Sequence, residues 1–265
     1  MTRLEQLTRL NNQLLDDMPW LRKQAEAFSR TEVAQWELFR SLVNVRRPCP
    51  ISDDFRKLQS DFLKKEIKNK GITDLKDLVS VRDDLYLWRG DITTLSVDAI
   101  VNAANSGLTG CYSPLHGCVD NAIHTFAGVE LRLECAKIME RQKASEPTGR
   151  AKITKAYNLP SRHVIHTVGP IVSGELTHTH CEQLACCYRS SLDLADRQAL
   201  NSIAFCCIST GEFHFPNQVA AQIAIETVED YKNKTGSSLA VVFTVFKEED
   251  DLIYQRLLRQ PSARG

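Results

Sequence analysis

The sequence predicts a layered α/β fold that is preceded by a helical extension. From Leu85 onward, short runs of β-branched and apolar residues alternate with longer helical segments, a pattern typical of α/β domains. The first 80 residues lack such runs and carry apolar residues at helical spacing instead. With 265 residues, 43% of them hydrophobic, the chain is long enough to bury a substantial core. We therefore divide it into an extension, residues 1–80, and a main domain, residues 81–265.

The extension is expected to contain three helices. Their apolar residues recur at helical spacing, at Leu4, Leu7, Leu10 and Leu14, at Val33, Trp36, Phe39, Leu42 and Val43, and at Phe55, Leu58, Phe62 and Ile67. Thr31 and Ser52 are candidate N-caps, and Gly71 ends the third helix. No catalytic constellation lies in this part. The extension is therefore predicted to pack against the main domain, and an independent functional domain is the less favoured alternative.

The main domain is expected to alternate strands and helices. The predicted strands, which are mostly apolar on both faces as a covered central sheet requires, are residues 85–88, 98–102, 163–168, 202–208 and 239–246. The predicted helices are residues 119–139, 181–199, 216–231 and 250–258. In sheets of this kind, ligands bind at the loops that follow the carboxyl ends of strands. Those loops are therefore the first candidates for a functional site.

Composition excludes several classes of protein. The 33 basic and 33 acidic residues give a formal net charge of zero, which argues against binding of nucleic acid or membrane by bulk electrostatics. No apolar run approaches the ~20 residues of a membrane helix. The N-terminus is polar and has no apolar signal core, so a cytoplasmic location is expected. Nine cysteines without a secretion signal predict reduced thiols, and a close cysteine cluster then indicates metal binding or catalysis.

Two loops after predicted strands are rich in glycine and small polar residues. Residues 102–110 read Asn-Ala-Ala-Asn-Ser-Gly-Leu-Thr-Gly, and residues 209–216 read Ser-Thr-Gly-Glu-Phe-His-Phe-Pro. Small residues let the backbone approach a ligand closely, and asparagines offer neutral donors and acceptors. The second loop leads into a helix, so its backbone N–H groups could form an anion-binding nest. Either loop alone also suits a purely structural turn.

Together with three further segments, these loops resemble the macrodomain family, whose members bind ADP-ribose. The segments are Trp-Arg-Gly-Asp-Ile-Thr (88–93), Asn-Leu-Pro (158–160) and Val-Ile-His-Thr-Val-Gly-Pro (164–170). The resemblance covers about two-thirds of the chain, from Leu85 to the C-terminus, with the motifs in family order. It implies a three-layer α/β/α fold with a mixed, mainly parallel central sheet.

The resemblance also assigns residues to the parts of ADP-ribose. Asp91 matches the acid that accepts from the adenine amino group, and Ile92 matches the neighbour whose backbone contacts the same end. Asn105 matches the asparagine that faces the distal ribose. The loop that wraps the diphosphate corresponds to Ser209, Thr210, Gly211, Glu212 and Phe213. Outside this context, Asp91 would be read as a turn residue and Asn105 as a loop cap.

A metal site is a second candidate feature. Cys111, His116 and Cys118 fall within eight residues, and Pro114 and Gly117 provide turns that could bring the three side chains together. Two thiolates and an imidazole suit zinc, and three protein ligands leave a fourth position open, as in catalytic sites. The spacing matches no common zinc-finger motif, so free cysteines in a turn are an equal alternative from the chemistry alone.

The resemblance favours the metal. Hydrolytic macrodomains have a glycine-rich run before the Val-Asp that opens a helix, whereas this chain has the Cys, Pro, His, Cys arrangement, as in the zinc-dependent macrodomains linked to a sirtuin-type transferase in microbial operons. The segments Glu-Pro-Thr-Gly (146–149) and Asn-Ala-Ile-His (121–124) match the same class. Asp120 takes the family's catalytic-acid position. Its alternative role is the N-cap of the helix, and His124 is expected to be a packing residue.

The sequence therefore predicts a zinc-dependent hydrolase that binds one Zn²⁺ and removes mono-ADP-ribose from Asp or Glu side chains of modified proteins. The resemblance adds a possible substrate, a lipoyl-carrier protein modified by a sirtuin-type transferase. Asn105 would position the ribose, and Asp120 would position water or accept its proton. One alternative is a non-catalytic ADP-ribose reader. Another is a structural zinc, closed by a fourth ligand such as Cys135 or Cys181.

Overall fold

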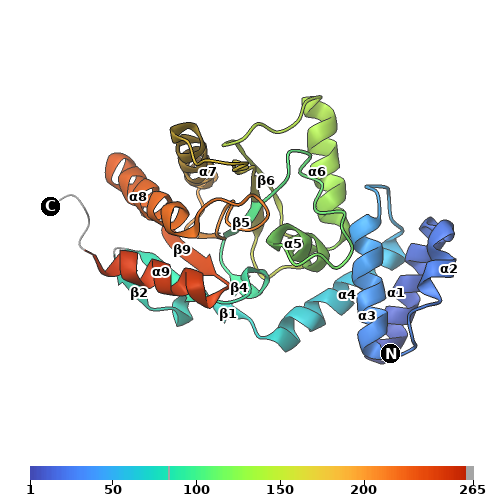
Figure 1. Ribbon diagram of the computed structural model, residues 1–265. Coiled ribbons are helices and arrows are strands. Elements are labelled where there is room, and N and C mark those ends of the chain that lie inside the picture. The colour runs from blue at the N-terminus through green and yellow to red at the C-terminus, as the bar shows by residue number, and fades with distance from the viewer. Residues whose placement is uncertain (83, 261–265) are drawn as a thin grey trace.

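A seven-stranded sheet forms the centre of the main domain. The computed structural model describes residues 1–82 and 84–260 (Figure 1). The strand order across the sheet is β2-β3-β9-β8-β5-β7-β6. The bounds, in this order, are Ser80–Arg82, Leu85–Arg89, Ala240–Val245, Ser202–Phe205, Ala99–Ala103, His163–Thr167 and Ala151–Lys155. The five inner strands are parallel, and each edge strand pairs antiparallel with its neighbour. The predicted mixed, mainly parallel sheet is confirmed.

Helices cover both faces of this sheet. On one face lie α5 (Val119–Ala127) and α6 (Val129–Gln142). On the other, α7 (His178–Arg197), α8 (Asn217–Thr235) and α9 (Glu248–Arg259) pack side by side (Figure 1). The inner strands are almost wholly buried, because helices exclude water from both of their faces. The expected three-layer α/β/α architecture is therefore confirmed.

The sequence predicted one helix wrongly and missed four strands. The helix expected over 119–139 is two helices, because Gly128 takes φ 97° and a Cβ there would lie 2.7 Å from the Gln59 amide. Strand β6 was missed, because its sequence, Ala-Lys-Ile-Thr-Lys, has few apolar residues. The short strands β1 (Thr73–Asp74), β2 and β4 (Leu95–Ser96) were missed too, and β1 pairs with β4 in a separate two-stranded ladder.

The N-terminal helices share a core with the main domain. Helix α1 (Arg3–Asp17) packs on α3 (Glu32–Val45) and α4 (Asp53–Lys70), and the short α2 (Arg22–Ala25) lies beside them (Figure 1). Thr31 and Ser52 are N-caps and Gly71 is a C-cap, as predicted. The ring of Trp36 contacts Phe39 and Phe62 of the extension and Phe126 of α5, with centroids 5.6–5.9 Å apart. In residues 1–82 and 84–260, no helix has the length and apolar character to cross a membrane.

Because this core is continuous, we expect the extension and the main domain to unfold together. Phe39 is fully buried in the shared cluster, so Phe39→Ala should lower the free energy of unfolding by about 3–5 kcal/mol in urea denaturation. Trp20, 71% exposed, is the control, and Trp20→Ala should change it by less than about 0.5 kcal/mol. Separate unfolding transitions for the two parts would contradict the shared core.

Candidate functional site

A cavity of about 730 Å³ opens at the carboxyl ends of four neighbouring parallel strands, β3, β9, β8 and β5. Loops after these strands, and the loop before α5, supply its walls. The residues that the sequence assigned to ADP-ribose binding, catalysis or zinc all line it, namely Asp91, Ile92, Asn105, Cys111, His116, Cys118, Asp120, Ser209, Thr210, Gly211, Glu212 and Phe213. The structure thus brings together segments that lie up to about 120 residues apart in the sequence.

Asp91 lies just after β3, at one end of the cavity. Its Oδ1 accepts hydrogen bonds from the Thr93 backbone N–H at 3.0 Å and from the Thr93 hydroxyl at 2.7 Å. Its Oδ2 pairs with Lys70 Nζ of α4 at 2.5 Å. Burial opposes ionisation of Asp91, but the bonds from Lys70 and Thr93 outweigh it and hold the pKa of this carboxyl below its usual value. Asp91 is therefore an ionised acceptor.

The loop from Ser209 to Phe213 presents backbone donors to the cavity. Among the residues that the structure describes, the N–H groups of Gly211, Glu212 and Phe213 have no acceptor. Ser209 takes φ 65° and packs so closely on Gly169 that a Cβ there would lie 2.0 Å from Ser209 Oγ. This packing holds the loop in one shape. Adjacent unpaired amides in a fixed loop are suited to binding an anion.

Asp120 does not cap α5, contrary to the alternative that the sequence allowed. The N-cap is Cys118, whose Sγ accepts from the Asn121 N–H at 3.4 Å. Asp120 lies one residue inside the helix, where its carboxylate accepts from Asn102 Nδ2 at 2.8 Å and from Asn105 Nδ2 at 3.4 Å. Burial raises the pKa of Asp120 to about 6. The carboxylate is therefore free of the capping role and a stronger proton acceptor than an exposed one.

Asn105 is held in the same cluster. Its Nδ2 also donates to the Gly110 carbonyl at 3.0 Å, and its Oδ1 accepts from the Gly107 N–H at 3.0 Å. The side chain thus braces the loop after β5, as a loop cap does, while it lines the cavity beside Asp120.

A buried hydrogen-bond network of Asn102, His166 and Thr154 holds Asp120 in place. Asn102 Nδ2 lies 3.2 Å from His166 Nδ1, and Thr154 Oγ1 lies 3.0 Å from His166 Nε2. Since the amide can only donate, Nδ1 accepts and Nε2 carries the proton, and burial lowers the pKa of His166 to about 3. Cys135 Sγ is 3.7 Å from Nε2. A protonated nitrogen cannot bind a metal, so we assign this group a supporting role.

Cys111, His116 and Cys118 converge as a metal site requires. Their ligand atoms all lie within 4.8 Å of one another, and Cys111 Sγ is 3.6 Å from His116 Nδ1. Tetrahedral zinc, with bonds of about 2.3 Å to sulfur and about 2.0 Å to nitrogen, separates these two ligands by ~3.6 Å. His116 Nε2 faces Glu212 Oε1 at 3.4 Å, the kind of outer partner that metal-bound histidines have. The donor set therefore fits zinc.

In the described part of the chain, the three ligands have no fourth protein partner. Cys135, one of the two candidates, groups with His124 and His166 instead, and Cys181 joins neither group. Burial raises the pKa of the Cys118 thiol to about 12, whereas zinc binds the thiolate, so metal binding at this site would release a proton. All three side chains line the cavity.

Comparison with known proteins decides the family. The family model described as "Macro domain" matches residues 101–224. The protein-ADP-ribose hydrolase of Treponema medium is 56% identical over 225 residues, which are 83% of this chain and 86% of that protein. That of Staphylococcus aureus is 50% identical over 222 residues, 83% of each chain. The chain belongs to the macrodomain family.

A solved macrodomain gives the same result at the level of the fold. The Trypanosoma brucei macrodomain in complex with ADP-ribose is 32% identical and superposes with a TM-score of 0.64, covering 82% of this chain and 94% of that one.

Sequence reasoning missed part of the macrodomain cavity. Phe246 follows β9 as Asp91 follows β3, and the two strands are joined by the Gly90 N–H, which donates to the Val245 carbonyl at 3.0 Å. The Phe246 ring is 78% exposed at the cavity wall, where a flat ligand can stack on it. Its place at the carboxyl end of a predicted strand was the signal. Thr244, Lys247, Asp250, Cys206 and Cys207 also line the cavity.

The residue before Cys111 must be a glycine. Gly110 takes φ 82°, and a Cβ there would lie 2.7 Å from the His124 ring. Gly110→Ala should therefore cost at least about 1–2 kcal/mol of unfolding free energy, measured by thermal or urea denaturation. Gly117, between His116 and Cys118, has open space around it. Gly117→Ala should therefore change the free energy of unfolding by less than about 0.5 kcal/mol. Equal losses in both variants would contradict this packing.

Proposed function

We propose that this macrodomain is a zinc-dependent hydrolase that removes single ADP-ribose units from Asp or Glu side chains of modified proteins. The observation that carries the proposal is the position of Cys111, His116 and Cys118 in one cavity with Asp120 and the anion-binding loop. Two relatives, 50% and 56% identical to this chain, are named protein-ADP-ribose hydrolases, which supports the same reaction here.

The cavity is suited to ADP-ribose along its whole length. Asp91 is an ionised acceptor for the adenine amino group, Ile92 lies beside it, and the Phe246 ring offers a surface on which the base can stack. The free amides of residues 211–213 would hold the diphosphate. This orientation leaves the distal ribose near Asn105, Asp120 and the metal ligands, where the bond to the acceptor lies.

In the proposed reaction, zinc and the protein side chains have different roles. Zinc held by Cys111, His116 and Cys118 would supply polarisation of the ester or ribose oxygens, or a water of lowered pKa. Asn105 positions the ribose, and Asp120 orients the attacking water or accepts its proton. Hydrolysis breaks the bond between ribose C1 and the acceptor oxygen, adds hydroxide to the ribose and releases the acceptor as a carboxylate. The fixed nucleotide supplies the orientation.

The rival function is a reader that binds ADP-ribose without cleaving it. A reader has no need of a soft metal triad with an open position beside the distal ribose, and this favours the hydrolase. A structural zinc lacks support, because neither Cys135 nor Cys181 joins the three ligands. The lipoyl-carrier substrate, its sirtuin-type transferase and the cytoplasmic location stay predictions from the resemblance and the sequence.

Removal of the metal should abolish turnover but not nucleotide binding. We expect Cys118→Ala, or treatment of wild type with a chelator, to slow release of ADP-ribose from a mono-ADP-ribosylated acceptor protein more than about 100-fold. Because Cys118 also caps α5, Cys118→Ser tests the two roles separately: the hydroxyl can cap the helix but is a poor zinc ligand.

The matched control for this measurement is Cys49→Ala, which removes a half-buried cysteine of the extension. It should retain full turnover. Undiminished cleavage by Cys118→Ala and by the chelated enzyme would exclude the zinc mechanism. Tight binding of ADP-ribose by zinc-loaded wild type without any cleavage would favour the reader.

Asp91→Ala should weaken nucleotide binding without affecting the metal. Loss of a charged hydrogen-bond acceptor predicts a Kd for ADP-ribose about 10- to 100-fold higher by isothermal titration calorimetry, with unchanged zinc content by elemental analysis. Asp54→Ala, which removes an exposed acid of α4, is the control and should match wild type. Loss of zinc in Asp91→Ala would show that the site is laid out differently.

A further inference from the structure

The metal loop, residues 111–118, is an irregular segment with a strained turn. Leu115, which directly precedes the ligand His116, takes φ 59°, a left-handed conformation that costs a leucine about 1–2 kcal/mol. Within the loop, the His116 N–H donates to the Ser113 carbonyl at a long 3.3 Å. A strained backbone of this kind persists only where its surroundings hold it. The contacts that do so come from Asn44 of the N-terminal extension and from two main-domain side chains, Arg132 and Asn121, that are themselves hydrogen-bonded to α3.

The first contact is made by Asn44, near the end of α3. Its side chain is 1% exposed, and its Oδ1 accepts from the Leu115 N–H at 3.1 Å. Its Nδ2 donates to Thr125 Oγ1 of α5 at 3.2 Å. Asn44 therefore fixes the left-handed residue against the helix that follows the loop, 71 residues away from Leu115 in the sequence.

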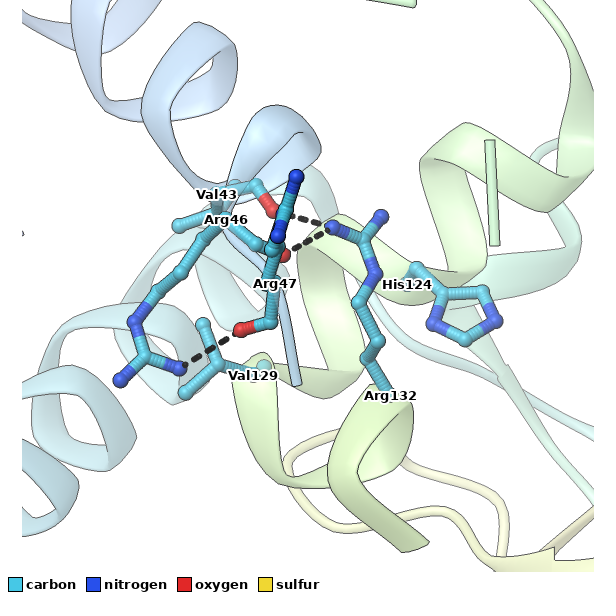
Figure 2. A pocket seen from close by; sticks show the side chains of 7 residues that line it. Val43, Arg46, Arg47, His124, Val129 and Arg132 are labelled. Atoms are coloured by element: carbon cyan, nitrogen blue, oxygen red, sulfur yellow. Dashed lines mark hydrogen bonds between the residues drawn. The ribbon is translucent and has the colours of Figure 1, made fainter. Parts of the chain in front are cut away.

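The second contact is made by Arg132 of α6, which is 4% exposed. Its Nη1 donates to the carbonyls of Val43, Asn44 and Arg46, at 3.0, 2.6 and 2.8 Å. Figure 2 shows the guanidinium directed at the carbonyls of Val43 and Arg46, with the His124 ring beside it. The negative end of the α3 dipole is a favourable place for a buried cation. The other nitrogen, Nη2, donates to the carbonyl of the ligand Cys111 at 3.1 Å.

A third contact reaches the middle of the loop. Arg40 Nη2 of α3 donates to Asn121 Oδ1 at 3.2 Å, and Asn121 Nδ2 donates to the Ser113 carbonyl at 3.0 Å. The loop is thus held at its first ligand, at its centre and next to its second ligand, and each contact leads to α3.

We propose that the N-terminal extension is part of the metal site, with Asn44 and Arg132 as positioning residues that set the geometry of Cys111 and His116. The inference rests on the proposed function, because it takes the triad to be a zinc site. Neither residue touches the ligand side chains. Each fixes the backbone from which a ligand extends, and outer partners of metal ligands change metal affinity by about 10- to 100-fold.

If the extension only stabilised the fold, its buried polar residues would affect stability and not zinc affinity. Two asparagines of the extension separate these roles. Asn44 and Asn11 are both buried asparagines of the extension, 1% and 2% exposed. Asn11 Nδ2 donates to the Gln35 carbonyl and to Gln35 Oε1, within the helical bundle and away from the metal loop. Both alanine variants lose buried hydrogen bonds, but only Asn44→Ala loses a contact to the loop.

The experiment measures zinc affinity directly, by competition of the purified full-length protein with a chromophoric chelator, and records the absorption spectrum of the Co²⁺ form. We expect Asn44→Ala to bind Zn²⁺ about 10- to 100-fold more weakly than wild type, with a weakened Co²⁺-thiolate band. Asn11→Ala should lower the Tm but keep wild-type affinity. Asn44→Asp retains an acceptor for the Leu115 N–H and should recover most of the affinity.

Equal zinc affinity in Asn44→Ala, Asn11→Ala and wild type would overturn the inference and leave the proposed function intact. The same holds if both variants lose affinity only in proportion to their loss of Tm. Absence of Zn²⁺ binding by wild type would instead remove the proposed function, and the inference with it. If Asn44→Ala does not fold, Asn44→Asp and Arg132→Lys decide, because unchanged zinc affinity in Arg132→Lys contradicts the role of the Arg132 contact with Cys111.

Discussion

The common direction of four neighbouring strands is the constraint on which the site depends. Because β3, β9, β8 and β5 are parallel and adjacent, their carboxyl ends meet at one edge, and each supplies one part of the cavity. The contributions are an ionised acid, an exposed aromatic ring, a nest of free amides and an asparagine beside a buried carboxylate. Lys247 is the one lysine or arginine among the described lining residues. Backbone N–H dipoles, more than cationic side chains, therefore make the cavity suited to an anionic ligand. This agrees with the formal net charge of zero for the chain.

Much of this fold is readable from local sequence, since a strand covered on both faces must be apolar throughout and a surface helix must be amphipathic. The predictions failed where local pattern carries little information. The edge strand β6 is half-polar, and β1, β2 and β4 are too short to have a period. Gly128 breaks a helix through a φ of 97°, and the space beside it is filled by Gln59, which lies 69 residues earlier, so the local pattern does not show that this position must be glycine.

The site, too, has residues that local sequence predicts and residues that only distant contacts explain. The two loops after β5 and β8 were found because the rule about carboxyl ends is local and general, whereas Asp91 and the residue roles came from the macrodomain resemblance. Phe246 obeys the same rule although it was overlooked. The helix cap was assigned to Asp120 as an alternative because aspartate is the commoner cap, whereas the structure gives that role to Cys118. The contacts of Asn44 and Arg132 with the metal loop join residues 71 and 21 positions apart across three elements. No periodicity or motif encodes such pairs.

If the adenine amino group binds Asp91, as the proposed function requires, it must replace Lys70 on the carboxylate, because the two side chains form an ion pair in the ligand-free protein. Thr93 saturates one carboxylate oxygen, and the ammonium of Lys70 occupies the other, so an incoming amino group competes with a charged group of the protein as well as with water. The displaced ammonium keeps a second partner, because it lies 3.8 Å above the centroid of the Phe126 ring. The free energy of ligand binding at Asp91 is then the difference between the hydrogen bond to the ligand and the ion pair with Lys70. Ligands are distinguished by how well their donor replaces the Lys70 ammonium.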